Sequence, residues 1–74
     1  MTIAITGATG FVGQVLLDRA LAEGHELRAL TRRHQPLRLG LDWVRGDLDD
    51  KPALKRLVRG AEAVIHVAGV VNSP

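Results

Sequence analysis

The feature that most constrains this chain is a set of three glycines, Gly7, Gly10 and Gly13, which separates two segments of different hydrophobic pattern. Residues 3–5 form a short apolar run, which is typical of a strand buried on both faces, as in a parallel sheet. After the glycines, apolar residues recur every three or four positions, which indicates a helix. The chain therefore begins with a predicted strand, a glycine loop and a helix in direct succession.

The predicted helix spans residues 10–23, and Gly24 follows as its C-terminal cap. Because residues four apart share one helical face, we expect its apolar side chains to pack against a sheet. These side chains are Val12, Val15, Leu16, Ala20 and Leu21.

Three further strands are predicted, at residues 26–31, 41–45 and 63–67. Between the first two, residues 32–40 contain Pro36 and several polar side chains, which favours a loop.

A second helix is predicted before the last strand, with Asp49 or Asp50 as its N-cap and Pro52 near its first turn. Gly60 ends it, and its apolar stripe is formed by Leu54, Leu57 and Val58.

The elements follow the order β-α-β-β-α-β, and the lengths of the crossovers demand parallel pairing. Right-handed crossovers then order the strands 3-2-1-4. The predicted fold class is α/β, a partial Rossmann-type doubly wound parallel sheet. The fourth strand would be an apolar, unprotected edge, which native proteins avoid. We therefore expect residues 1–74 to be the N-terminal part of a larger domain whose further strands cover that edge.

Composition excludes several classes of protein. The 74 residues allow at most one small domain, and the absence of cysteine excludes disulfides and fits a reducing, cytoplasmic location. No apolar stretch reaches the roughly 18 residues of a membrane span, and no basic region marks a signal peptide. The net charge of +2 is too small to indicate a nucleic-acid partner, and the three histidines lack metal-ligand spacing.

Each glycine of the loop has an expected role. Gly7 permits the tight turn out of the strand, Gly10 lets a phosphate group approach the backbone, and Gly13 lets the helix pack closely. The spacing Gly-x-x-Gly-x-x-Gly departs by one residue from the dinucleotide pattern Gly-x-Gly-x-x-Gly. No Lys-Ser/Thr pair follows, which excludes a nucleoside-triphosphate P-loop.

The first helical turn supplies the expected anion donors. Its N–H groups lack partners within the helix, and the helix dipole is positive at that end. We expect Phe11 and Val12 to contribute backbone amides to a diphosphate, and Thr9 its hydroxyl. The alternative is a glycine-rich turn without a ligand.

The end of the second strand indicates which dinucleotide binds. An NAD site places a carboxylate there, whereas this chain has Arg32 and Arg33, and Glu26 sits at the opposite end of the strand. A guanidinium suits a 2′-phosphate because its planar donors match the dianion. The sequence therefore predicts NADP over NAD; the alternative is that both arginines are solvated loop residues.

Three segments in this order resemble the extended or atypical short-chain dehydrogenases/reductases, and most closely the NAD(P)-dependent epimerase/dehydratase group. They are residues 6–13, the triplet Gly46-Asp47-Leu48, and residues 66–69. The resemblance implies that Asp47 accepts a hydrogen bond from the adenine amino group and that Leu48 packs on the ring. It also implies that Ala68 and Gly69 let the backbone approach the cofactor ribose.

Asp47 could instead be an acidic turn residue beside a helix N-terminus, and Ala68 and Gly69 could be simple turn residues. We expect His66 to be structural, and His25 and His34 to be exposed in turns.

The chain departs from the family in its catalytic residues. The family's chemistry uses a Tyr-x-x-x-Lys pair with a Ser or Thr, but this chain has no tyrosine, and Ser73 lies in the wrong place. We therefore expect these residues to bind and not to catalyse alone. The resemblance implies a parent oxidoreductase or nucleotide-sugar epimerase/dehydratase acting on a small-molecule substrate. A non-catalytic dinucleotide-binding sensor or assembly module, or a structural fragment without a ligand, is the alternative.

Overall fold

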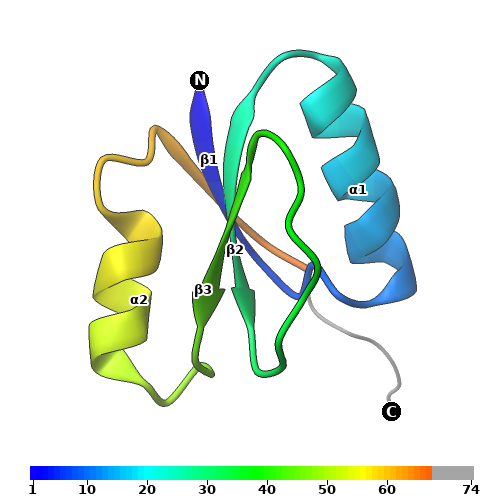
Figure 1. The fold of residues 1–74 in the computed structure, drawn as a ribbon. Helices are drawn as coiled ribbons and strands as arrows, with labels where there is room; N and C mark the ends of the chain where they lie inside the picture. Colours follow the sequence, from blue (N-terminus) through cyan, green and yellow to red (C-terminus); the bar gives the residue numbers. More distant parts are fainter. Residues whose placement is uncertain (68–74) are drawn as a thin grey trace, which may run out of the picture.

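The computed structural model of the protein describes residues 1–67, which form a parallel sheet with a helix on each face (Figure 1). The strands lie in the order β3-β2-β1-β4, and every pairing is parallel. The predicted class, element order and strand order are thereby confirmed. The elements are β1 (Thr2–Thr6), α1 (Phe11–Ala22), β2 (Glu26–Thr31), β3 (Leu41–Arg45), α2 (Lys51–Val58) and β4 (Ala63–His66).

The central strand β1 is buried on both faces, as its apolar run predicts. Ile3 and Ile5 belong to the core beneath α1, whereas Ala4, which points the other way, belongs to the core beneath α2. Leu17 of α1 and Leu57 of α2 are almost fully buried in these two cores. The fold therefore has three layers, with α1 and α2 on opposite sides of the sheet (Figure 1).

The buried face of α1 agrees with the predicted one at Ala20, which is buried, and at Leu16 and Leu21, which pack against the core partly buried. It differs at the other two predicted residues. Gly13, Leu17 and Ala20 are buried, while Val12 and Val15 are 64% and 55% exposed. The reason is Gly13, because a Cβ at this position would lie 2.2 Å from the carbonyl oxygen of Gly7. Contact between Gly13 and the loop sets the rotation of the helix, and this rotation turns Val12 and Val15 away from the sheet.

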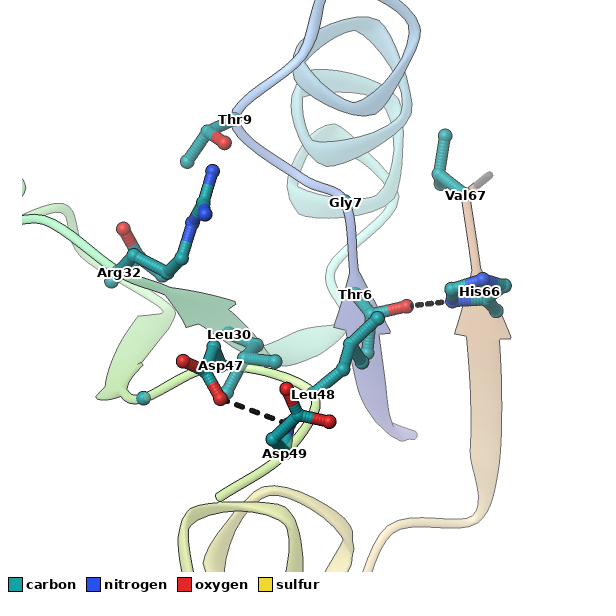
Figure 2. A pocket seen from close by; sticks show the side chains of 12 residues that line it. Thr6, Gly7, Thr9, Leu30, Arg32, Asp47, Leu48, Asp49, His66 and Val67 are labelled. Carbon is teal, nitrogen blue, oxygen red and sulfur yellow. Dashed lines mark hydrogen bonds between the residues drawn. The ribbon is translucent and has the colours of Figure 1, made fainter. Parts of the chain in front are cut away.

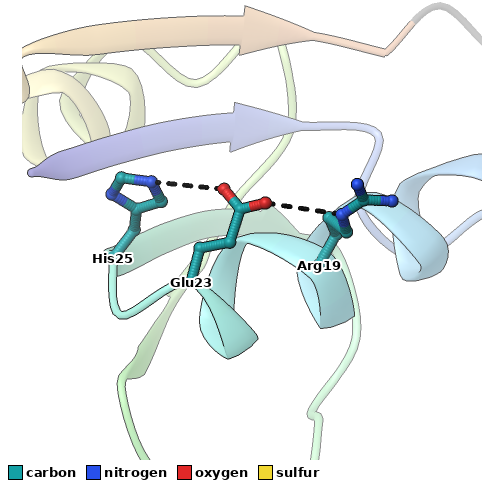
Figure 3. A network of polar contacts seen from close by, with 3 residues as sticks. All are labelled: Arg19, Glu23 and His25. Atoms are coloured by element: carbon teal, nitrogen blue, oxygen red, sulfur yellow. Dashed lines mark hydrogen bonds and ion pairs between the residues drawn. The ribbon is translucent and has the colours of Figure 1, made fainter.

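Helix α1 begins after its N-cap Gly10, and Gly24 follows its C-cap Glu23 with a φ of +87°. The Glu23 carboxylate lies between Arg19 and His25 (Figure 3). Its Oε2 is 3.4 Å from Arg19 Nε, and its Oε1 is 3.8 Å from His25 Nε2. His25 is half-buried in this contact, so the prediction that it is exposed was wrong.

The N-cap of α2 is Asp50, whose Oδ1 accepts a hydrogen bond from the Ala53 N–H at 3.1 Å. Of the predicted stripe, Leu57 is buried and Leu54 half-buried, but Val58 is exposed. Ala53 takes the inward position instead, because it lies one turn before Leu57 on the same face.

Strand β4 lies at the edge of the described sheet and pairs with β1. The pairing continues past the strand, since the Val67 N–H donates to the Thr6 carbonyl at 3.0 Å. The covering of this edge by further strands stays a prediction. Within residues 1–67, neither helix combines the length and apolar character needed to cross a membrane.

Candidate cofactor-binding site

A pocket of about 570 Å³ lies where the four parallel strands end (Figure 2). Open α/β sheets bind ligands at this edge, next to the point where the strand order reverses. Here the order reverses between β1 and β4. The lining comes from β1, β2 and β4, the glycine loop and the turn after β3: Thr6, Gly7, Thr9, Leu30, Thr31, Arg32, Gly46, Asp47, Leu48, Asp49, His66 and Val67.

The three glycines of the loop differ in what surrounds them. Gly7 has a φ of +79°, and a Cβ there would lie 2.1 Å from the Val67 carbonyl oxygen. A Cβ at Gly13 would meet the Gly7 carbonyl oxygen, whereas one at Gly10 would have its nearest contact at 3.8 Å. Gly7 and Gly13 therefore let protein segments pack together, and the space beside Gly10 is open to a ligand.

In the described part of the chain, the N-terminus of α1 has no side-chain cap, whereas Asp50 caps the N-terminus of α2. Gly10 is the N-cap of α1, and no side chain among the described residues bonds to that end. Phe11, the first residue of the helix, is 84% exposed. The N–H groups of this turn, which have no intrahelical partners, therefore remain for an anion such as a diphosphate.

The structure separates the two arginines that follow β2. Arg32 lines the pocket, and its side chain extends toward Thr9 (Figure 2). Arg33 is exposed and is not one of the lining residues of the described chain. Glu26 pairs with Thr2 at the opposite end of the sheet, as predicted.

The turn after β3 forms the wall that faces the glycine loop. Asp47 Oδ1 accepts a hydrogen bond from the Asp49 N–H at 2.9 Å, and Leu48 is half exposed beside it. The turn role and the ligand role of Asp47 are compatible, because a carboxylate has several acceptor positions.

Part of the pocket lining was not predicted from the sequence, including Thr6. Thr6 Oγ1 is hydrogen-bonded to His66 Nδ1 across β1 and β4, and both residues line the pocket (Figure 2). The contact agrees with a structural role for His66. The signal for Thr6 was its place directly before Gly7, at the carboxyl end of a buried strand.

Apart from Arg33, which is exposed and lies outside the lining, the predicted site residues fall into three groups. The pocket lining brings together Gly7, Thr9, Arg32, Asp47 and Leu48. Beside it, at the start of α1, lie Gly10, Phe11, Val12 and Gly13. Ala68 and Gly69 lie outside the described residues.

The parallel sheet, the glycine loop and the pocket at the carboxyl edge define a dinucleotide-binding α/β protein. The chain belongs to the NAD dependent epimerase/dehydratase family, whose model matches residues 3–74. The family resemblance read from the sequence is thereby confirmed.

Two relatives and one solved structure illustrate the similarity. Ceramide reductase of Caulobacter vibrioides is 45% identical over 96% of this chain and 24% of that protein. 2-Alkyl-3-oxoalkanoate reductase of Stenotrophomonas maltophilia is 40% identical over 89% of this chain and 21% of that protein. A short-chain dehydrogenase/reductase superfamily protein from Agrobacterium tumefaciens, solved with bound NAD, has a TM-score of 0.79 and 29% identity, over 97% of this chain and 21% of that one. The chain thus spans about a quarter or less of the length of these proteins.

Proposed function

We propose that this chain binds NADP(H) at the carboxyl edge of its sheet and forms the cofactor-binding segment of an oxidoreductase. The observation that carries the proposal is Arg32, a guanidinium in the pocket lining at the end of β2. A 2′-phosphate on the adenosine ribose is the cofactor group whose charge and geometry match it.

The residues present fit a dinucleotide. Open space beside Gly10 admits a diphosphate, and the amides of Phe11 and Val12 begin a helix that no described side chain caps. Asp47 and Leu48 form the adenine wall in this proposal. When bound, the dinucleotide supplies hydride transfer at its nicotinamide ring. The residues of this chain bind and orient its phosphate and adenosine portions.

Both relatives described above are named reductases, which supports an oxidoreductase, and a nucleotide-sugar epimerase/dehydratase stays the alternative. The proton that accompanies hydride transfer needs an acid/base residue. The resemblance of this chain to the family implies that this residue is a tyrosine. Because this chain contains no tyrosine, we assign cofactor binding and not proton transfer to these residues. A cytoplasmic location stays a prediction from composition.

Parallel titrations of the protein with NADPH and NADH, followed by nicotinamide fluorescence, test the proposal. We expect NADPH to bind about tenfold or more tightly than NADH, the ratio that about 1.4 kcal/mol of extra phosphate binding gives. Equal affinities, or a preference for NADH, would refute the assignment of NADP(H). No binding of either nucleotide would refute the cofactor site itself.

A further inference from the structure

Thr31, the last residue of β2, has a hydroxyl whose hydrogen-bonding capacity is fully used within one turn. The residue is only 4% exposed. Its Oγ1 donates to the Arg33 carbonyl at 2.8 Å and accepts from the Arg33 N–H at 3.2 Å and from Gln35 Nε2 at 3.4 Å. A hydroxyl has one donor and two acceptor lone pairs, so these three bonds saturate it.

These bonds close the backbone around Arg32, which is the residue between the two that are bonded. The Arg32 side chain makes none of them and extends over the pocket (Figure 2). The Thr31 carbonyl also accepts from the Gly46 N–H at 2.9 Å, directly before the Asp47 turn. Thr31 therefore links the arginine side of the pocket to the opposite wall.

The rest of the loop from 32 to 40 is held separately. Trp43 Nε1 donates to the Pro36 carbonyl at 3.2 Å, and Arg38 Nη2 lies 2.6 Å from Asp18 Oδ1 on α1. These contacts fix the far part of the loop, and the Thr31 hydroxyl fixes the part that carries Arg32. Such preorganisation strengthens binding because less conformational freedom is lost on association.

We propose that Thr31 is a positioning residue for selection of the 2′-phosphate: its hydroxyl holds the backbone on both sides of Arg32 so that the guanidinium faces the pocket. This inference rests on the proposed NADP(H) function. It assigns the cofactor specificity to two residues: Arg32, which contacts the 2′-phosphate, and Thr31, which orients Arg32.

Thr31→Val tests the inference, because valine keeps the shape and strand preference of threonine but removes the hydroxyl. We expect its affinity for NADPH to fall about three- to tenfold, the loss of about one net hydrogen bond, with NADH affinity changed less than about twofold. Thr31→Ser should retain the wild-type preference. Arg38→Ala, which loosens the far part of the loop, is the matched control and should also retain it.

Amide hydrogen exchange supplies a second measurement that needs no ligand. The Arg33 amide should exchange faster in Thr31→Val than in the wild type, while amides in the middle of β2 stay unchanged. An unchanged Arg33 amide, or equal losses for NADPH and NADH, overturns the positioning role.

The outcomes separate this inference from the proposed function. A wild-type protein without preference for NADPH overturns both, whereas a preference that survives Thr31→Val overturns the positioning role alone. Should Thr31→Val not fold, Thr31→Ala and Thr31→Ser give the same comparison, because both lack the methyl group and they differ only in the hydroxyl.

Discussion

The glycines of the loop differ in whether the protein or open space lies where a side chain would be. The protein itself occupies the space of a side chain at Gly7 and Gly13, but not at Gly10, whose φ of −78° suits any residue. The evenly spaced glycines therefore serve two different purposes: the outer two allow chain packing, and in the proposed function the middle one gives the ligand access to the backbone.

Alanine substitutions should separate these two functions. Gly13→Ala should lower the free energy of unfolding by about 1–3 kcal/mol, the usual cost of overpacking. Gly10→Ala should raise that free energy by about 0.4–1 kcal/mol, because alanine restricts the unfolded chain, yet should weaken NADPH binding. Urea unfolding measures the first quantity and fluorescence titration the second. A stable Gly13→Ala variant would contradict the packing role, and unaltered NADPH binding by Gly10→Ala would contradict the ligand role.

The two neighbouring arginines allow a matched test of specificity. Arg32→Ala should weaken NADPH binding by about 1.5–3 kcal/mol, the range for a charge-assisted hydrogen bond, and should barely change NADH binding. Arg33→Ala removes the same charge from an exposed position beside the pocket lining. If the Arg33 variant lost as much NADPH affinity as the Arg32 variant, the loss would come from the changed net charge, and the specific role of Arg32 would be contradicted.

At the scale of elements, α2 is capped at both ends by side chains. Asp50 caps its N-terminus, while Arg28 from β2 donates to the carbonyls of Arg56, in the last turn, and of the C-cap residue Arg59. The Arg56 contact measures 2.7 Å. The short helix is thus joined to the strand beneath it by polar bonds as well as by its buried leucine.

Asp50→Ala should therefore lower the free energy of unfolding by about 0.5–2 kcal/mol, the range for loss of an N-cap. Asp49→Ala is the control, because its side chain does not cap the helix in the described structure, and it should change stability by less than about 0.5 kcal/mol. Thermal or urea unfolding of both variants provides the measurement. A larger effect at Asp49 would show that the capping residue is assigned wrongly.

At the scale of the whole molecule, the pocket is lined by the ends of β1, β2 and β4 and by the turn after β3, so it exists only when the sheet is assembled. A ligand that binds there should therefore stabilise the folded chain as a unit. Such stabilisation distinguishes the proposed cofactor-binding function from the alternative that the chain is a structural segment without a ligand.

NADPH at a hundredfold excess over its dissociation constant should stabilise the fold by about 2.7 kcal/mol. For a chain of this size, such a gain corresponds to a rise in melting temperature of roughly 10–20 °C. Differential scanning fluorimetry or circular dichroism measures the shift, and adenosine without phosphates serves as a control. A melting temperature that millimolar NADPH leaves unchanged would support the ligand-free alternative.

The family and the topology follow from local patterns. The apolar run at 3–5, the glycine spacing and the two crossovers predict parallel strands in the order 3-2-1-4, which the structure has. These features can be predicted from the sequence because a strand, a glycine turn and a helix each depend on neighbouring residues. The nearness of Arg32 and Asp47 to the loop follows too, since the carboxyl ends of parallel strands share one edge.

Other properties depend on particular atomic contacts, some of them local, that hydrophobic patterns and residue spacings do not record. The buried face of α1 is set by contact of Gly13 with the loop, and the pocket side of the arginine pair by the bonds from Thr31. The pairing of Thr6 with His66 joins residues 60 positions apart. The sequence by itself determined the elements, their order and the edge at which the site lies, because those depend on backbone preferences and chain connectivity. Only the structure decided the rotation of α1, the orientation of the arginines and the partners of the buried hydroxyls, because these depend on specific atomic contacts that residue patterns do not specify.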